Sequence, residues 1–280
     1  METEESRQIQ EYYALGLEEQ RLKRGIAMLE FARMQEIIQR CLPLPPAVVY
    51  DVGGGAGAYS LWLARLGYVV HLFDLVPDLV RLARKASACQ PEAPIARLEV
   101  ADGRRLDRED GSADAVLLMG PLYHLPERAA RLDALTEARR VLKPGGVLIA
   151  AAISRFGSLL WGISTFGAAN TILAEPAFQE MIRRELADGQ HLRPPEYPGF
   201  IARAYFHLPD ELRSEVSEAG FQAVSLLAVE GPCWIAPNFS EVWADEQKRA
   251  ALLDAARLIE SQPALMGVSP HLVAIGYKPN

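Results

Sequence analysis

Four glycines within five positions follow a short apolar run in this 280-residue chain. The run, residues 48–52, is β-branched and aromatic, which is typical of a buried parallel strand, and residues 58–66 have the apolar spacing of a helix. Glycine lets a ligand lie directly against the backbone, and the helix that follows presents its first N–H groups to that ligand. Together the three elements predict a nucleotide-binding corner.

Two cofactors fit this corner. The spacing of Gly53 and Gly55 matches the dinucleotide fingerprint, and Asp74 stands about 20 residues further on, where that fingerprint places a ribose-binding acid. This interpretation gives an NAD(P)-dependent oxidoreductase. With Asp51 and Gly57, however, the same stretch spells Asp-x-Gly-x-Gly-x-Gly. A carboxylate at the strand end is unfavourable beside a pyrophosphate but favourable beside an ammonium and a sulfonium, which points to S-adenosyl-L-methionine (SAM).

Composition narrows the range of partners. The net charge is −7, the isoelectric point is about 5.4, and no long run of lysine or arginine occurs, which argues against nucleic acid or an anionic membrane. Cys41, Cys89 and Cys233 are isolated and lack metal-ligand spacing, so we predict no metal site and a reducing compartment. With no signal peptide and no apolar run of membrane-spanning length, we expect a cytoplasmic protein acting on a small molecule.

Strands and helices alternate through the first half of the chain. We expect strands at 48–52, 68–74, 95–100, 113–119 and 147–153, with helices at 58–66, 77–88 and 126–142. Such alternation predicts a parallel sheet with right-handed crossovers.

The flanking regions predict additions to this sheet. Residues 1–46 form a helical arm that breaks near Gly16 or Gly25, and the sheet core begins at residue 47. Residues 154–207 contain no obvious strand and several helices, which is typical of a lid or binding insert. Residues 208–280 complete the core with helices at 209–219 and 240–261 and strands at 221–229 and 271–277.

With these elements placed, the chain resembles the class I SAM-dependent methyltransferases over residues 47–153 and 208–278. Motifs in the family order carry the resemblance: the segment 51–57, Asp74, Ala101-Asp102-Gly103, and the segment 137–146 before the fifth strand. The chain is also similar to a group of uncharacterised bacterial methyltransferases. The resemblance implies a Rossmann-like seven-stranded sheet of order 3-2-1-4-5-7-6, with the last strand antiparallel.

The resemblance also implies a cofactor site. In the family, a carboxylate after strand two binds the ribose hydroxyls and an aspartate after strand three accepts the adenine amino group. The N-terminal arm, residues 1–46, is expected to cap the cofactor. The expected SAM-binding residues are Tyr13, Asp51, Gly53, Gly55, Gly57, Asp74, Leu75, Ala101, Asp102, Gly103, Met119 and Gly120.

Four polar residues are candidates for the chemistry. His124 follows strand four directly and is a candidate base, although packing is the commoner role of such a histidine. Arg155, His191 and His207 lie in or at the edge of the 154–207 insert, which we expect to hold the acceptor. Arg155 and Arg193 would suit an anionic or polar acceptor.

The predicted activity is transfer of a methyl group from SAM to a small molecule, with S-adenosylhomocysteine as product. Two alternatives stay open: an NAD(P)-dependent oxidoreductase and a SAM-binding regulatory protein without catalysis.

Overall fold

A seven-stranded sheet forms the centre of the molecule. The computed structural model describes residue 22, residues 24–167 and residues 169–280. The strands are β1 (Val48–Val52), β2 (Val69–Asp74), β3 (Arg97–Val100), β4 (Ala113–Leu118), β5 (Leu142–Ile153), β8 (Gln222–Ala228) and β9 (His271–Tyr277). They lie in the order β3-β2-β1-β4-β5-β9-β8, parallel from β3 to β5, and β9 is antiparallel to both neighbours. Since β6 and β7 lie outside this sheet, β8 and β9 are its sixth and seventh strands, and the expected order is confirmed.

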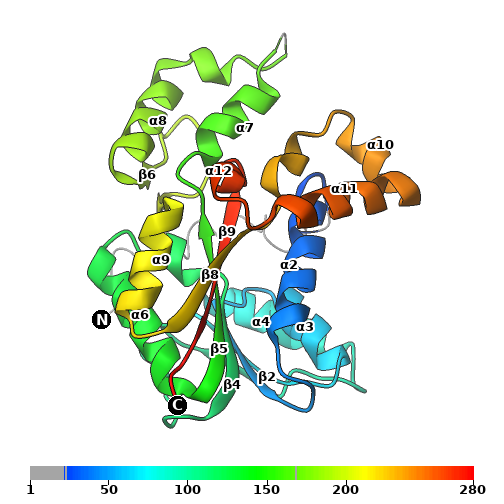
Figure 1. Cartoon of the computed structure of the whole chain (residues 1–280), viewed down its shortest axis with the longest axis vertical. Coiled ribbons are helices and arrows are strands. Elements are labelled where there is room, and N and C mark those ends of the chain that lie inside the picture. Colours follow the sequence, from blue (N-terminus) through cyan, green and yellow to red (C-terminus); the bar gives the residue numbers. More distant parts are fainter. Residues whose placement is uncertain (1–21, 23, 168) are drawn as a thin grey trace.

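Helices cover both faces of the sheet (Figure 1). One face carries α6 (Arg128–Val141) and α9 (Pro209–Glu218), and the other carries α2 (Ala27–Cys41), α3 (Ala58–Arg65) and α4 (Pro77–Ala88). Neighbouring strand residues divide between the two layers: Tyr50 packs with the first set of helices and Val49 with the second. This alternation explains why the central parallel strands β1 and β4 are mostly apolar on both faces.

An insert of helices and short strands stands beyond the carboxyl end of β5, at the top of Figure 1. It contains α7 (Gly157–Thr165), a 3-10 turn η2 (Ile172–Ala174), α8 (Pro176–Asp188), β6 (Gln190–Leu192) and β7 (Arg203–Tyr205). The expectation of an insert without strands was wrong, because β6 and β7 pair antiparallel as a small sheet. Three-residue strands are too short for an alternating pattern, so only their pairing defines them.

The remaining helices are short, or shorter than expected. They are α5 (Pro121–His124), the 3-10 turn η3 (Gly231–Ile235), α10 (Phe239–Ala244), α11 (Glu246–Ile259) and α12 (Pro263–Met266). The single helix expected at 240–261 was wrong. Asp245 divides it, since its carboxylate accepts hydrogen bonds from the N–H groups of Gln247 and Lys248 and so begins a second helix.

The N-terminal arm is described from residue 24 onward, together with residue 22. Gly25 has a left-handed φ of 53° and precedes α2, as the expected break near Gly25 requires. Gly16 and Tyr13 lie outside the described residues. No helix in the described ranges, 24–167 and 169–280, is long and apolar enough to cross a membrane.

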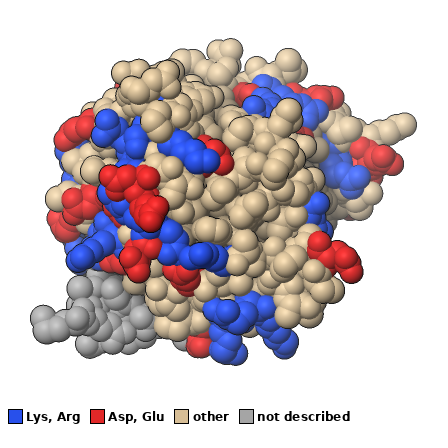
Figure 2. Space-filling model, turned by 90° about the horizontal axis from the view of Figure 1, so that it is seen from below, with Lys and Arg blue, Asp and Glu red and all other residues tan. Residues whose placement is uncertain are grey.

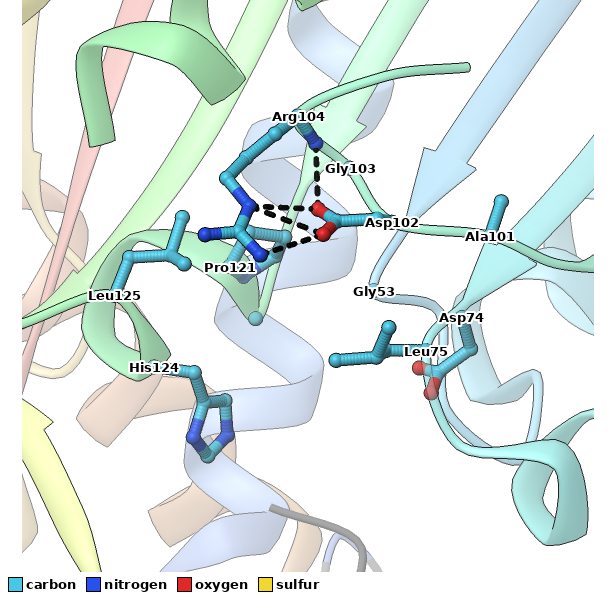
Figure 3. A pocket seen from close by; sticks show the side chains of 11 residues that line it. Gly53, Asp74, Leu75, Ala101, Asp102, Gly103, Arg104, Pro121, His124 and Leu125 are labelled. Carbon is cyan, nitrogen blue, oxygen red and sulfur yellow. Dashed lines mark hydrogen bonds and ion pairs between the residues drawn. The ribbon is translucent and has the colours of Figure 1, made fainter. Parts of the chain in front are cut away.

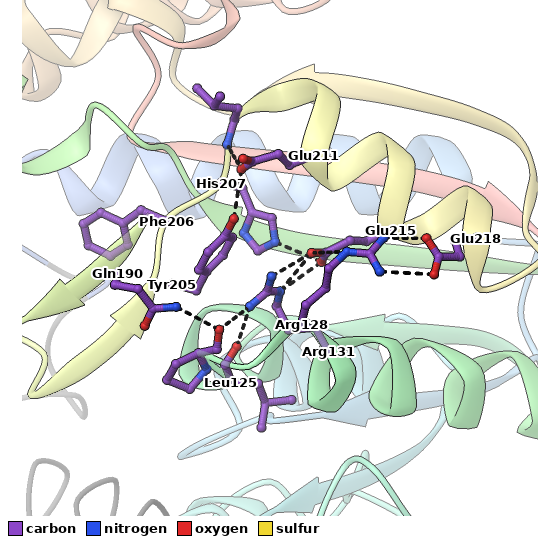
Figure 4. Close-up of polar contacts among 12 residues, drawn as sticks. Leu125, Arg128, Arg131, Gln190, Tyr205, Phe206, His207, Glu211, Glu215 and Glu218 are labelled. Carbon is purple, nitrogen blue, oxygen red and sulfur yellow. Dashed lines mark hydrogen bonds and ion pairs between the residues drawn. The ribbon is translucent and has the colours of Figure 1, made fainter. Parts of the chain in front are cut away.

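A buried arginine joins the insert to the core (Figure 4). Arg131 of α6 is 1% exposed and donates hydrogen bonds to the Glu215 carboxylate of α9 and to the carbonyls of Leu125 and Pro126. Its guanidinium lies 3.6 Å from the ring centroid of Tyr205 in β7. Four separate segments therefore meet at one side chain.

Glu215 stays ionised in this cluster because two neighbours compensate its negative charge. Burial raises the pKa of Glu215, but the hydrogen bonds and charges of His207 and Arg131 hold that pKa at about 2. Removing one partner of a buried ion pair leaves the other charge uncompensated, which costs about 3–5 kcal/mol.

We therefore expect Arg131→Met to lower the free energy of unfolding by about 3–5 kcal/mol at neutral pH, measured by urea denaturation. The Glu215 pKa is lower in the folded protein than the ordinary 4.5. The ionised Glu215 thus contributes to the free energy of unfolding above about pH 4.5, and this contribution is lost as the pH falls toward about 2. The difference in the free energy of unfolding between wild type and variant must therefore shrink over that range. Arg81→Met, at an exposed ion pair, is the control. Equal losses in both variants would contradict the role of Arg131.

Candidate active site

One cavity lies at the carboxyl ends of β1 to β4 (Figure 3). Most of the residues expected to bind SAM line it. The lining consists of Gly53, Asp74, Leu75, Ala101, Asp102, Gly103, Arg104, Gly120, Pro121, His124 and Leu125. Parallel strands direct their carboxyl ends to one edge of the sheet, and this brings together residues separated by more than 70 positions.

The glycine corner has the open backbone that a ligand requires. Gly53 has φ 76°, and a Cβ there would meet the Cδ of Pro121 at 2.6 Å, so any other residue would push β1 away from α5. Gly55 has φ 56°, and nothing lies within 4 Å of a Cβ built on it. The backbone at Gly53 therefore packs closely against Pro121, whereas the backbone at Gly55 faces open space.

Asp74 is held in position at the end of β2. Its carboxylate accepts hydrogen bonds from the N–H groups of Gly55, at 2.8 Å, and Val76, at 2.9 Å. The acid is therefore part of the glycine corner itself, and its orientation depends on the fold of that loop.

Asp51 is completely buried behind the corner. It accepts a 2.6 Å hydrogen bond from Ser60 Oγ, while its Oδ1 atom has no hydrogen-bond partner among the described residues. Burial, and next the charge of Asp74, raise the pKa of Asp51 to about 6, although the Ser60 bond opposes this. An acceptor with an unused oxygen suits a cationic ligand group and disfavours a pyrophosphate, so the corner fits SAM.

Arg104 is a lining residue that the sequence analysis missed. Its guanidinium and backbone N–H bind both oxygens of Asp102, the former at 2.6–3.0 Å (Figure 3). Burial raises the pKa of Asp102, but the hydrogen bonds and charge of Arg104 bring it below its ordinary value. The proximity of Arg104 to Asp102 in the sequence was the available signal.

Four other expected residues do not line the cavity or are not described. Gly55 and Gly57 shape the loop, and Met119 is buried, with its carbonyl accepting a hydrogen bond from the Tyr123 hydroxyl. Tyr13 lies outside the described residues. Their contacts with the cofactor stay predictions.

His124 lines the cavity, as expected for a residue directly after β4. Burial lowers its pKa to about 4. A base with so low a pKa accepts protons weakly at neutral pH, and a catalytic role for His124 stays a prediction.

Arg155 and His207 are buried in the framework of the insert. Arg155 donates hydrogen bonds to the Phe206 carbonyl and to Glu211, and His207 contacts Glu215 at 3.2 Å. Burial lowers the pKa of His207, although Glu215 opposes this. These partners are those of structural side chains, and a catalytic role for either residue stays a prediction.

A second cavity, of about 300 Å³, lies between the insert and the edge of the sheet. Ile153, at the end of β5, and His271, at the start of β9, form its floor, and these two residues are directly paired. Aromatic and aliphatic side chains form most of its walls. The lining consists of Ile26, Ile153, Gly157, Ser158, Trp161, His191, Gly199, Phe200, Ile201, Phe206, Trp234, Pro270 and His271.

This lining includes neither Arg155 nor Arg193. Arg193 donates its hydrogen bonds to the carbonyls of Pro198 and Phe200. The expectation that these arginines would suit an anionic acceptor is therefore not supported by the structure.

His191 lines the second cavity, but both of its ring nitrogens are engaged. Nε2 lies 2.8 Å from the Ile201 carbonyl, which can only accept, and Nδ1 lies 2.6 Å from Glu185 Oε1. Its ring stacks on Phe206. Neither nitrogen has a lone pair directed at the cavity, so His191 is a fixed wall residue in this conformation.

Comparison with known proteins agrees with this geometry. Residues 50–150 match the methyltransferase domain family. The ubiquinone biosynthesis O-methyltransferase of Xylella fastidiosa is 32% identical over 183 residues, covering 62% of this chain and 67% of that protein. The protein of the same name from Xanthomonas campestris is 32% identical over 172 residues, covering 60% and 65%. The chain thus spans about two thirds of the length of these relatives.

Solved structures show the same fold. A SAM-dependent methyltransferase of Methanosarcina mazei aligns with a TM-score of 0.58 and 20% identity, over 87% of this chain and 97% of that one. A possible histamine N-methyltransferase of Thermotoga maritima aligns with a TM-score of 0.57 and 17% identity, over 96% and 98%.

The fold and the glycine corner define a class I methyltransferase, and this chain belongs to the SAM-dependent methyltransferases. Its cofactor is SAM, and its reaction is methyl transfer to a small molecule with S-adenosylhomocysteine as product. The oxidoreductase alternative is not supported.

Asp74→Asn tests the cofactor site. The change removes a charged acceptor and keeps an oxygen for one of the two loop N–H groups, so we expect SAM to bind more weakly by about 1.5–3 kcal/mol in calorimetry. Asp78→Asn, on the exposed first turn of α4, is the matched control and should bind SAM as the wild type does. Equal weakening in both variants, or none in either, would sink the assignment of Asp74.

Proposed function

We propose that the protein methylates a hydroxyl oxygen of a small, apolar, aromatic acceptor bound in the second cavity. The observation that carries the proposal is the composition of that cavity: Trp161, Phe200, Phe206 and Trp234 line it, together with aliphatic side chains, and none of the described lining residues is an arginine or lysine. Such a lining favours a ring over an anion, because a buried anion would lack a cationic partner among the described lining residues.

The size of the cavity supports the same class of acceptor. A volume of about 300 Å³ is at the low end of small-molecule sites, and suits a substituted ring better than a macromolecular segment. Aromatic pairs stiffen the walls: Trp161 meets Phe200 edge-on at 5.4 Å between ring centroids, and Phe200 in turn contacts Tyr197.

Transfer to oxygen is proposed from the relatives. Both bacterial proteins that share 32% identity are named O-methyltransferases of ubiquinone biosynthesis. Ser158 and His271 are polar residues of the lining and provide hydrogen-bonding groups for an acceptor hydroxyl.

For the cofactor, each of three acids has a proposed role. Asp74 would accept the ribose hydroxyls, Asp102 with Arg104 would bind the adenine, and Asp51 would balance the positive charge of the methionine part. When bound, SAM supplies an electrophilic methyl group on a sulfonium. The protein then has to align the acceptor and exclude water, which accounts for most of the rate gain in such displacements.

The parts of the chain divide accordingly in this proposal. Residues 1–46 cap the cofactor, 47–153 and 208–280 form the core, and 154–207 carry the acceptor. On the face seen in Figure 2, basic and acidic side chains lie beside each other instead of gathering by sign. On this face, which is opposite the insert, the mixture forms no basic patch of the kind that nucleic acid requires.

Substitution of a wall residue tests the proposal. Purified protein with SAM should release S-adenosylhomocysteine with catechol and 4-nitrophenol but not with aliphatic carboxylates. Trp161→Ala removes a half-buried aromatic side chain from the cavity wall, so kcat/KM for catechol should fall by a factor of about 10 to 100, as expected for the loss of about 1.5–3 kcal/mol of apolar contact.

SAM affinity should stay within about twofold, since Trp161 lies outside the cofactor cavity. Trp243→Ala is the control, because Trp243 stacks on Phe239 and is not a lining residue. A similar fall in the control, or turnover of carboxylates instead of phenols, would overturn the assignment of the acceptor.

A further inference from the structure

Ser158 is a polar residue of the second cavity, at the edge of the sheet where the cofactor is bound. It lies in the first turn of α7, shortly after Ile153, the last residue of β5. β5 lies beside β4, and the carboxyl end of β4 borders the cofactor cavity. A ligand hydroxyl that contacts Ser158 is therefore held on the side of the second cavity nearest to β4.

The hydroxyl of Ser158 donates its proton to a buried carboxylate. Its Oγ atom lies 2.9 Å from Oε1 of Glu185 in α8, and Glu185 is completely buried. An ionised carboxylate only accepts hydrogen bonds, so the proton of this contact is that of Ser158. A serine hydroxyl has one proton and two lone pairs. What Ser158 can offer to a ligand is thus its lone pairs.

Glu185 is fixed in this position. It shares one face of α8 with the buried Phe178 and Ile182, at the spacing of successive helical turns. Its Oε1 atom also lies 2.6 Å from Nδ1 of His191, whose Nε2 is bound to the Ile201 carbonyl. Whichever of the two atoms carries the proton between Glu185 and His191, Oε1 keeps a lone pair for the serine hydroxyl.

The second oxygen of Glu185 makes the bond from Ser158 more important. Oε2 is buried and has no hydrogen-bond partner among the described residues. A carboxylate that already has one unpaired oxygen in the interior loses more when a donor to the other oxygen is withdrawn. We therefore expect Ser158 to keep donating to Glu185 when a ligand enters the cavity.

We propose that Ser158 selects the unmethylated acceptor over its methylated product, with Glu185 as the positioning residue; this inference rests on the proposed function. An acceptor O–H donates a hydrogen bond to Oγ of Ser158. Methyl transfer replaces that proton by a methyl group, so the ether oxygen of the product faces the lone pairs of Ser158 without a proton between them. The cavity thus holds the substrate and releases the product.

The aromatic walls cannot make this distinction. Trp161, Phe200 and Phe206 offer apolar surface, which binds a phenol and its methyl ether through the same contacts. The added methyl group even gains apolar contact, so these walls by themselves favour the product. Nor can His191 distinguish the two, because both of its nitrogens are engaged within the protein. Selection against the product therefore requires a polar group such as Ser158.

The test compares 4-methylphenol with its methyl ether, 4-methylanisole. Calorimetry at about pH 7, with S-adenosylhomocysteine bound, measures both affinities, and a phenol of this kind keeps its proton there as a tyrosine side chain does. The wild type should bind the phenol about tenfold more tightly than the ether, as expected for one hydrogen bond. Ser158→Ala should reduce this ratio to about one or below by weakening the binding of the phenol.

Three further variants separate recognition from a purely structural role. Ser158→Thr keeps the hydroxyl and should keep a preference for the phenol. Glu185→Met removes the acceptor of the Ser158 proton, so that the hydroxyl can donate to an ether, and 4-methylanisole should bind more tightly than it does to the wild type. Ser164→Ala, at an exposed position of the same helix outside the lining, is the matched control and should behave as the wild type.

Turnover gives a second readout. Added 4-methylanisole should inhibit methylation of 4-methylphenol only weakly in the wild type and in Ser164→Ala. In Ser158→Ala the same concentration should inhibit strongly, because the variant no longer prefers the substrate.

The outcomes separate this inference from the proposed function. If the wild type methylates 4-methylphenol but binds the phenol and the ether equally, the role of Ser158 is wrong and the proposed function stands. The same conclusion follows if Ser158→Ala weakens both ligands by one factor, since a structural residue would do so. A wild type that binds SAM but methylates no phenol would overturn both proposals.

Discussion

The contact between Arg131 and Glu215 is the interaction on which the arrangement of both cavities depends. Arg131 binds the carbonyls of Leu125 and Pro126, directly after α5, and its guanidinium lies on the ring of Tyr205 in β7. α5 borders the cofactor cavity, and β7 pairs with β6, which carries His191 of the second cavity. A single desolvated cation therefore contacts segments that adjoin both cavities. Buried ion pairs give little net stability but define geometry closely, because any displacement exposes an unpaired charge to a low-dielectric interior.

The two cavities share one edge of the sheet for a topological reason. The parallel strands β1 to β4 end at the cofactor, while β5 continues to Ile153 beneath the second cavity. The antiparallel β9 then starts where β5 ends, so His271 enters the same edge from the opposite direction. A parallel seventh strand would have placed its first residue at the far edge. The reversal of this strand is thus what lets a residue near the C-terminus take part in the site.

Burial changes the pKa of an acid and of a histidine in opposite directions. Asp51 is buried behind the glycine corner and Asp74 lines the first cavity, and burial, helped by the charge of Asp74, raises the pKa of Asp51 to about 6. A cation relieves such a pair, which makes the corner selective for a positively charged cofactor. The surroundings of the histidines differ. Burial lowers the pKa of His124, in the first cavity, to about 4, whereas His271 and His191, in the second cavity, each contact a carboxylate.

Local pattern was sufficient for the sheet, the glycine corner and the acids that follow β2 and β3. Residues 48–57 carry strand, turn and helix start within one short segment, and α4 begins at Pro77 because proline favours a first helical turn. The sequence also indicated an insert after Ile153, since its strand and helix alternation stops there. It missed β6 and β7, whose three-residue lengths have no period, and the break at Asp245, where a capping hydrogen bond overrides helical spacing.

The composition of the second cavity was decided by tertiary structure. Trp161, His191 and Trp234 come from α7, β6 and η3, and no spacing in the chain relates them. Nor does spacing in the sequence predict that Arg155 forms an ion pair with Glu211, or that Glu230 forms a hydrogen bond with His271, 41 residues away. Turns, helix caps and apolar periodicity involve residues that are close in the chain, and so they can be recognised in the sequence. Long-range pairings depend on strand order and register, which determine the partner of each buried charge.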